Sequence, residues 1–153
     1  MVFSLALRVL RDRAVAEELA QDVFLQFYRQ LDQIETPQHA VWWLRRTTSH
    51  RAIDELRKRK YRPVAGLDRA PEPADRSGQP DLFLNQRLRK LVDALPDKAR
   101  MIVVLRYQED LSPMEIAEML EMPVATVKSL LHRSLTALRG KIEKGLRVVE
   151  GWA

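Results

Sequence analysis

The chain has 153 residues, 46% hydrophobic and 31% charged, which is the composition of a globular protein and excludes one that is disordered throughout. Its formal net charge of +5 and pI of about 9.8 favour an anionic partner, either nucleic acid or a phospholipid surface. It has no cysteine, which excludes disulfides, and no apolar run approaches the roughly 18 residues of a membrane helix, so we expect a cytoplasmic protein without membrane insertion.

Residues 1–62 have the periodicity of helices interrupted at Pro37. Before the proline, apolar side chains recur every fourth residue and form one stripe: Leu19, Val23, Phe27 and Leu31. Another face of this helix is polar and carries Glu18, Gln21 and Asp22. After the proline, the positions expected to face inward are Val41, Leu44, Thr48, Ala52, Ile53 and Leu56. No alternation of Val, Ile and Thr predicts a strand anywhere in the chain.

The second of these helices runs into a basic segment, "RAIDELRKRKYR", from Arg51 to Arg62. Six of its twelve residues are Lys or Arg, and five of those six lie in the closing "RKRKYR". A run of like charges is typical either of a solvated helix end or of a site for a polyanion. The run alone does not decide between the two.

Residues 63–83 have the composition of a linker. Prolines and glycines break every helical or strand period here: Pro63, Pro71, Pro73, Pro80, Gly66 and Gly78. Residues 1–62 carry 12 basic and 8 acidic side chains, residues 63–86 carry 2 and 4, and residues 87–153 carry 12 and 9. We therefore expect two basic helical lobes on a flexible acidic tether, each too small to bury a large core alone.

The second lobe begins with a further apolar stripe of Leu84, Leu88, Leu91 and Leu95. Pro96 ends that helix, and the next one is expected to bury Met101, Ile102 and Leu105. These positions predict a helical second lobe built in the same way as the first.

The most informative stretch is "LSPMEIAEMLEMPVATVKSLLHRSLTALR". Ser112 and Glu115 have the spacing of a capping box, and Pro113 stands at the first helical position. After "EMP", the apolar positions of a second helix are Val124, Val127, Leu131, Leu135 and Leu138. Its other side shows Thr126, Lys128, Ser129, His132 and Arg133. This pattern is typical of a helix-turn-helix that reads the major groove; a helical hairpin with a basic outer face is the alternative.

Three stretches in this order resemble the extracytoplasmic-function (ECF) group of bacterial sigma factors: "AEELAQDVFLQFYRQL", "WWLRRTTSHRAIDELRKRKYR" and the "LVDALPDKAR…LTALR" segment. The resemblance implies an all-α fold of two small helical domains joined by a flexible linker, the second containing the helix-turn-helix. It places sigma region two at residues 1–62, the linker at 63–83 and region four at 84–153. It implies a promoter-specificity factor that binds core RNA polymerase and directs initiation at promoters with −10 and −35 elements.

The resemblance also implies site residues. Those expected to dock on the β′ clamp helices of the polymerase are Glu18, Gln21 and Asp22. Those expected at the −10 element are Trp43, His50, Arg57, Lys58, Arg59, Lys60 and Arg62. Those expected at the −35 element, in a domain that also contacts the β flap, are Thr126, Lys128, Ser129, His132 and Arg133. Family members commonly have an anti-sigma partner as well.

Three positions depart from the family pattern. His50 stands where the family usually has Asn, seven residues after Trp43, which puts the identity of the recognised −10 base in doubt. Leu130 occupies a position where a basic residue is common, and Glu121 a turn position often given to Gly. The sequence also starts well inside region two, at Val2, so we expect either that its start is mis-assigned or that the first helix of this domain is trimmed.

Two other functions fit the sequence less well. A stand-alone helix-turn-helix regulator would need only the second lobe to bind duplex DNA, but it has no use for a polar docking face at Glu18 to Asp22. An enzyme is disfavoured, because His39, His50 and His132 are scattered and the chain has no HExxH, Gly-rich phosphate loop or nucleophile elbow. We expect no catalytic activity, no metal and no cofactor.

Overall fold

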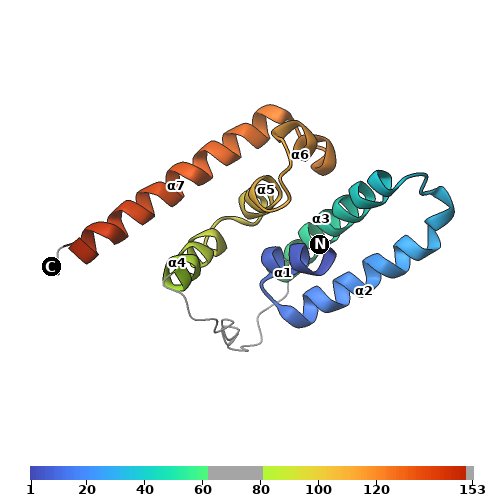
Figure 1. Ribbon diagram of the computed structural model, residues 1–153, viewed down its shortest axis with the longest axis horizontal. Coiled ribbons are helices and arrows are strands. Elements are labelled where there is room, and N and C mark those ends of the chain that lie inside the picture. Colours follow the sequence, from blue (N-terminus) through green and yellow to red (C-terminus); the bar gives the residue numbers. More distant parts are fainter. Residues whose placement is uncertain (62–80, 151–153) are drawn as a thin grey trace.

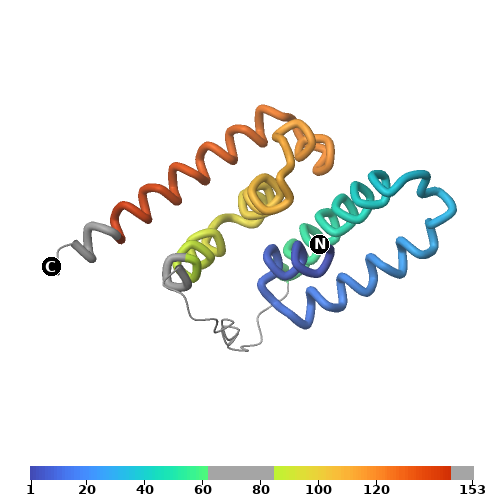
Figure 2. Tube along the Cα trace, viewed as in Figure 1, coloured from blue at the N-terminus to red at the C-terminus, as the bar shows by residue number. Residues whose placement is uncertain are grey.

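The computed structural model describes residues 1–61 and 81–150, with side chains placed for residues 1–61 and 85–145. In these ranges the chain forms seven α-helices and one short 3-10 helix, without a strand (Figures 1 and 2). The elements are α1 (Val2–Leu10), α2 (Arg13–Arg29), η1 (Leu31–Gln33), α3 (Pro37–Tyr61), α4 (Asp81–Asp93), α5 (Asp97–Tyr107), α6 (Pro113–Leu120) and α7 (Val124–Glu150). The predicted all-α class is confirmed. Arg62 and the predicted linker up to residue 80 lie outside the described residues.

The first domain is a long antiparallel hairpin of α2 and α3, with the short α1 lying against one end of it (Figure 1). Arg11 ends α1 in the left-handed conformation, with φ of 58°, and its N–H donates to the Leu7 carbonyl at 2.8 Å. Asp12 then begins α2 by accepting a hydrogen bond from the Val15 N–H at 3.2 Å. Two consecutive caps therefore produce the sharp turn that brings α1 back onto the hairpin.

The core of this domain lies where α1 covers the hairpin. The fully buried apolar residues of the three helices are Val2, Leu5, Ala6, Val9, Leu10, Ala16, Leu19, Ala20, Val23, Ala52 and Leu56. Two of the predicted inward positions are wrong, because Leu31 is 44% exposed and Val41 is 40% exposed. α2 ends at Arg29, so Leu31 falls in η1, and both residues lie at the end of the hairpin that α1 does not reach (Figure 1).

The second domain is built around α5, which buries seven consecutive residues from Ala99 to Leu105. This segment is buried on all sides because α1, α3, α4, α6 and α7 all pack against α5. The predicted burial of Met101, Ile102 and Leu105 is confirmed.

The stripe predicted along α4 is only partly inward. Leu95 is buried and Leu91 is half-buried, whereas Leu88 is 43% exposed, so its prediction is wrong. Among the described helices α4 packs against α5 and α7, and its last residue, Asp93, also pairs with Arg11 at 3.3 Å. The side chain of Leu84 lies outside the described residues.

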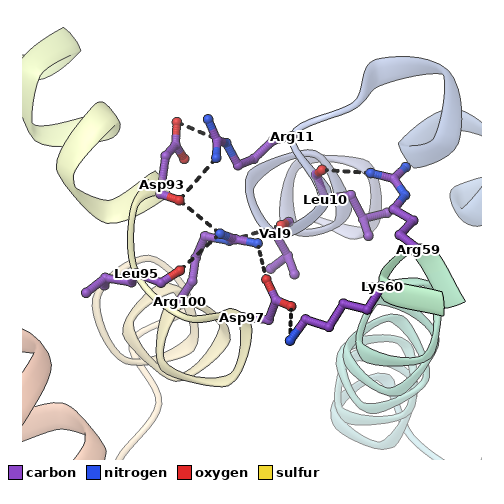
Figure 3. A network of polar contacts seen from close by, with 9 residues as sticks. All are labelled: Val9, Leu10, Arg11, Arg59, Lys60, Asp93, Leu95, Asp97 and Arg100. Atoms are coloured by element: carbon purple, nitrogen blue, oxygen red, sulfur yellow. Dashed lines mark hydrogen bonds and ion pairs between the residues drawn. The ribbon is translucent and has the colours of Figure 1, made fainter. Parts of the chain in front are cut away.

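The two domains share one continuous core, with α5 against α1 and α3 and with α6 against α3. The guanidinium of Arg100 on α5 is almost fully buried at this junction. It donates to the carbonyl oxygens of Val9 at 3.1 Å and Asp93 at 3.0 Å, and pairs with Asp97 at 3.0 Å (Figure 3). Burial lowers the pKa of Arg100 from its ordinary value, and the Asp97 carboxylate opposes that shift. The buried charge is thus tied to both domains.

Candidate nucleic-acid interface

α6 and α7 form the helix-turn-helix that the sequence predicts. The Ser112 hydroxyl accepts from the Glu115 N–H at 3.2 Å, and the Glu115 carboxylate accepts from the Ser112 N–H at 2.7 Å, which confirms the capping box. The bond from the Ser112 backbone is the main reason why the pKa of Glu115 is lowered from its ordinary value of 4.5. Pro113 occupies the first turn, where its missing N–H leaves no helical bond unmade.

The turn between the two helices is made by Glu121, which adopts the left-handed conformation with φ of 54° and ψ of 48°. This conformation lets the Met122 N–H reach the Ala117 carbonyl at 3.0 Å. A residue with a Cβ is strained here by roughly 1–2 kcal/mol, which is why Gly is common at such a position. The sequence departs from that rule, and the Glu121 carboxylate pairs with Arg46 of α3.

α7 presents one polar face to solvent immediately after this turn. The five residues predicted for the −35 element are all exposed: Thr126, Lys128, Ser129, His132 and Arg133. The opposite side of the helix buries Val127, Leu131 and Leu138. This side of the helix is therefore exposed, as insertion of a helix into a major groove requires.

α2 presents the predicted docking residues Glu18, Gln21 and Asp22 in exposed positions. Beside them lie three exposed apolar side chains that the sequence analysis did not identify: Phe24 (52% exposed), Leu25 (57%) and Tyr28 (74%). They do not belong to the apolar stripe that contains Leu19 and Val23. Apolar residues outside that stripe are the sequence signal that could have predicted these exposed side chains.

A polar groove of about 760 Å³ runs between α2 and α3. Glu18 and Asp22 line one side of it, and His50 and Lys58 line the other. Arg51 joins the two helices through Asp22 at 3.5 Å and through Gln26 at 2.8 Å. The structure therefore brings predicted docking residues and predicted −10 residues to one groove.

The basic segment at the end of α3 divides into solvated and structural side chains. Arg57 and Lys58 are exposed, and Arg57 makes a long ion pair with Asp54 at 3.9 Å. Arg59, in contrast, donates to the Leu10 carbonyl at 3.2 Å and pairs with Asp12 and Glu55, each at 3.5 Å. Lys60 pairs with Asp97 of the second domain at 3.0 Å (Figure 3).

The adjacent tryptophans face different partners, as their positions on a helix require. Trp43 packs against Phe27 across the hairpin, with ring centroids 5.5 Å apart and planes inclined by 50°. Trp42 carries the guanidinium of Arg46 over its ring at 5.2 Å and lines a hollow of about 430 Å³ with Leu111 and Met119. Trp43 therefore also has a packing role inside the first domain.

Two family models match the chain: Sigma-70 region 2 over residues 1–62 and Sigma-70, region 4 over residues 85–138. The ECF RNA polymerase sigma factor SigW of Bacillus subtilis (strain 168) is 31% identical over an alignment 158 residues long. The alignment covers 92% of this chain and 82% of SigW. The chain belongs to the ECF group of the sigma-70 family. The ECF sigma factor SigK of Mycolicibacterium vanbaalenii is 30% identical over 146 residues, covering 90% of this chain and 74% of SigK.

As an ECF sigma factor, the protein confers promoter specificity on transcription initiation, and its family acts without catalytic chemistry of its own. A solved structure of RpoE from Bartonella quintana, in complex with the anti-sigma factor NepR, has the same fold. The TM-score is 0.73 at 20% identity, over 93% of this chain and 89% of RpoE. Within the described part of this sigma factor, no helix has the length and apolar character to cross a membrane, and no cluster of potential metal ligands occurs.

Besides Lys60, the sigma factor holds a second predicted −10 residue, His50, against its own region four. The Nε2–H of His50 donates to the Met119 carbonyl of α6 at 2.8 Å, and the His50 ring is half-buried. Arg45 and Arg46, which the sequence analysis did not single out, also reach region four through Glu109 and Glu121. No local pattern could reveal these contacts, because they join segments more than sixty residues apart.

Proposed function

We propose that this sigma factor docks on core RNA polymerase through α2, places α3 on the separated −10 strand and inserts the start of α7 into the major groove of the −35 element. The observation that carries the proposal is the exposed polar face of α7, where all five predicted −35 residues stand free of the core behind a capped helix-turn-helix. Residues 1–62 act as region two and residues 84–153 as region four.

The docking surface on α2 combines carboxylates with exposed apolar rings. Glu18 and Asp22 suit a cationic partner surface, and Phe24 and Tyr28 supply apolar area that association would remove from water. Both kinds of side chain lie outside the core of the domain, so a partner can contact them while the core stays intact. The β′ clamp helices of the polymerase are the partner proposed for this face, and the β flap is proposed for region four.

The −10 surface is proposed to consist of His50, Arg57 and Lys58 along α3. Arg57 and Lys58 are exposed and positioned to meet phosphates, each contact releasing counterions. Arg59 and Lys60 already have partners within the protein, so their role in DNA binding is proposed to be indirect, through the placement of the end of α3.

Run-off transcription tests this function. Core polymerase is incubated with a library of genomic fragments from the source organism, with and without the protein, and the transcript ends are sequenced. We expect new start sites that share one pair of elements only when the protein is present. Tight, sequence-specific binding to duplex DNA without polymerase, together with no new start site, would favour a stand-alone regulator.

An anti-sigma protein is proposed as a further partner, supported by the solved complex of RpoE with NepR. Such a protein would lower run-off transcription in proportion to its amount, and added sigma factor would restore it. Inhibition that excess sigma factor does not relieve would point to an effect on the polymerase instead.

A further inference from the structure

The C-terminal part of α7 carries cations that none of the surfaces described above includes. α7 is one uninterrupted helix from Val124 to Glu150 (Figure 1), whereas the match to Sigma-70, region 4 ends at residue 138. Beyond that residue Lys141 and Lys144 are exposed, and neither has a carboxylate partner among the side chains that the structure places. The helix that carries the predicted −35 residues therefore continues into a segment with unpaired positive charge.

Arg87 of α4 brings a third cation to the same place. α4 packs against α7, and Gly145 of α7 is buried beneath the Arg87 side chain. A Cβ at position 145 would collide with the guanidinium of Arg87, so the glycine provides the room in which that group lies. Glycine is, after proline, the poorest helix former. Its presence inside α7 is explained by this close approach of Arg87.

The helical period gathers the three cations. Lys141 stands four residues before Gly145 and therefore on the same face of α7, and Lys144 is the direct neighbour of Gly145. Arg87 lies over that glycine. Like charges placed this close repel one another, and within the described part of the chain no carboxylate pairs with any of the three. Such a cluster is suited to an anionic partner.

The position of the cluster along α7 matches the dimensions of duplex DNA. Lys144 stands eleven residues after Arg133, the predicted base-reading residue. Eleven residues are about three helical turns, so the two side chains leave α7 on the same side, about 16 Å apart along its axis. The major groove is about 12 Å wide. With Arg133 at a base edge, Lys144 is therefore beyond the groove, at the phosphates that border it.

The surroundings of the cluster favour DNA over a protein partner. Between Val124 and Gly145, α7 exposes no large apolar side chain, and on the described part of α4 Leu88 is the one that does. The centre of a protein interface is apolar and poor in charge. Contacts to the DNA backbone, in contrast, are made by Arg and Lys side chains.

We propose that Arg87, Lys141 and Lys144 form a site for the phosphates beside the −35 element, which strengthens promoter binding without reading bases. The inference rests on the proposed function, because it takes α7 as the helix that enters the −35 groove. It adds a sequence-independent contact outside the five predicted −35 residues. Each neutralised phosphate releases counterions, so the contact makes promoter binding more sensitive to salt.

The test is the salt dependence of promoter binding by the holoenzyme, on a promoter found by run-off transcription. The logarithm of the affinity falls linearly with the logarithm of the salt concentration, by about 0.9 per neutralised phosphate. Lys141→Ala combined with Lys144→Ala should make this slope shallower by about two units, on matched and mismatched −35 elements alike. Arg87→Ala should make it shallower by about one unit.

Arg89→Ala combined with Arg139→Ala is the matched control, because it also removes two exposed cations from α4 and α7. At about 100° per residue, Arg139 lies about 160° around α7 from Lys141, and Arg89 lies about 160° around α4 from Arg87. The control should leave the slope unchanged. Lys141→Arg combined with Lys144→Arg keeps the charges and should keep the slope, which separates a lost contact from a lost fold.

The DNA side of the contact can be altered as well. Neutral methylphosphonate linkages are placed one at a time on both strands, within one helical turn of the −35 element. We expect linkages at the contacted phosphates to weaken binding of the wild-type holoenzyme. The same linkages should not weaken binding by the variant with alanine at positions 141 and 144, because that variant has already lost the contact.

Equal slopes for the wild type and the double alanine variant would overturn the phosphate site, and so would an equal loss of slope in the matched control. Weaker co-purification of the double alanine variant with core polymerase, at an unchanged slope, would overturn it in favour of an acidic protein partner. A wild-type holoenzyme without preference for any promoter would refute the proposed function, and the inference would fall with it. Promoter preference with equal slopes would refute the inference alone.

Discussion

The Nε of Arg100 donates to the carbonyl oxygen of Val9 at 3.1 Å, so a side chain of region four closes the last turn of a helix in region two. The same guanidinium donates to the carbonyl of Asp93, the last residue of α4, at 3.0 Å and to that of Leu95, just beyond the helix, at 3.3 Å. One buried cation therefore neutralises the negative ends of two helices from different domains.

Replacing Arg100 should destabilise the whole chain. We expect Arg100→Ala to lower the free energy of unfolding by about 3 kcal/mol or more, because the buried carbonyls of Val9 and Leu95 lose their donor. The Asp93 carbonyl keeps its bond from Arg11, and Asp97 keeps its pair with Lys60. Arg106→Ala on the same helix, where the side chain is 36% exposed, should cost less than about 1 kcal/mol. Urea unfolding of the two variants measures both effects, and equal losses would contradict the role given to Arg100.

The left-handed turn at Glu121 predicts an unusual order of stability. Glu121→Ala and Glu121→Gly both remove the carboxylate that pairs with Arg46, so their difference reports the backbone alone. With φ at 54°, the glycine variant should be more stable than the alanine variant by about 1 kcal/mol. At an ordinary helical position the order is reversed, so finding alanine more stable by thermal or urea unfolding would show that the turn is not left-handed.

The capping box predicts a dependence of stability on pH. Because folding lowers the pKa of Glu115 from 4.5, its ionised form stabilises the folded state, fully above about pH 5 and progressively less as the pH falls through the lowered pKa. The difference in unfolding free energy between wild type and Glu115→Gln should therefore shrink between pH 6 and pH 3. Urea unfolding of both proteins at several pH values measures this difference. A constant difference over that range would remove the carboxylate from the cap.

On α7, Arg133 and Lys128 should differ in how they recognise the −35 element. The planar fork of Arg133 suits a guanine edge, whereas the Lys128 ammonium acts more as a point charge toward phosphate. We expect Arg133→Ala to reduce the preference for the matched element by roughly 1–3 kcal/mol, and Lys128→Ala to lower the salt slope by about one unit for all sequences. Holoenzyme binding to matched and mismatched promoters at several salt concentrations tells them apart.

The control for this pair is Arg139→Ala, an exposed position farther along α7 than the five predicted −35 residues. It should change neither quantity. If Arg133→Ala weakens matched and mismatched promoters equally, its assignment to a base is wrong.

The docking face predicts that reversing its charges abolishes binding to core polymerase while the protein stays folded. Glu18→Arg combined with Asp22→Arg should abolish co-purification with core polymerase, because both exposed carboxylates become repulsive to a cationic partner. The melting temperature should change little, since neither side chain is part of the core. Glu17→Arg with Asp32→Arg reverses two exposed charges outside the predicted docking face and should leave binding intact. Retained binding by the first pair at ordinary salt would refute the surface.

Local rules account for much of what the sequence could predict. The capping box of Ser112 and Glu115 depends on four neighbouring residues, and the burial of Met101, Ile102 and Leu105 follows from an apolar run after a proline. The exposed face of α7 follows from a helical period. The roles assigned to those exposed residues in DNA and polymerase binding stay predictions.

Other features depend on which helices pack against one another, and the periodicity of a segment does not indicate its packing partners. Leu31 and Val41 have the right spacing for burial, but no helix covers that end of the hairpin. Arg100 directly precedes the apolar run from Met101 to Leu105, and the packing of α1, α4 and α5 supplies the carbonyls that make its burial tolerable. The Nε2–H of His50 donates a hydrogen bond to a carbonyl 69 residues away along the chain.

The acceptor for His50 is a main-chain oxygen, and this has an evolutionary consequence. No substitution at position 119 can delete the carbonyl of Met119, whereas a substitution at position 50 can delete the donor. That position is also the one proposed to read a −10 base. A lineage that changes its promoter preference there would alter, in the same mutation, this hydrogen bond between the two domains, and the two traits would be selected together.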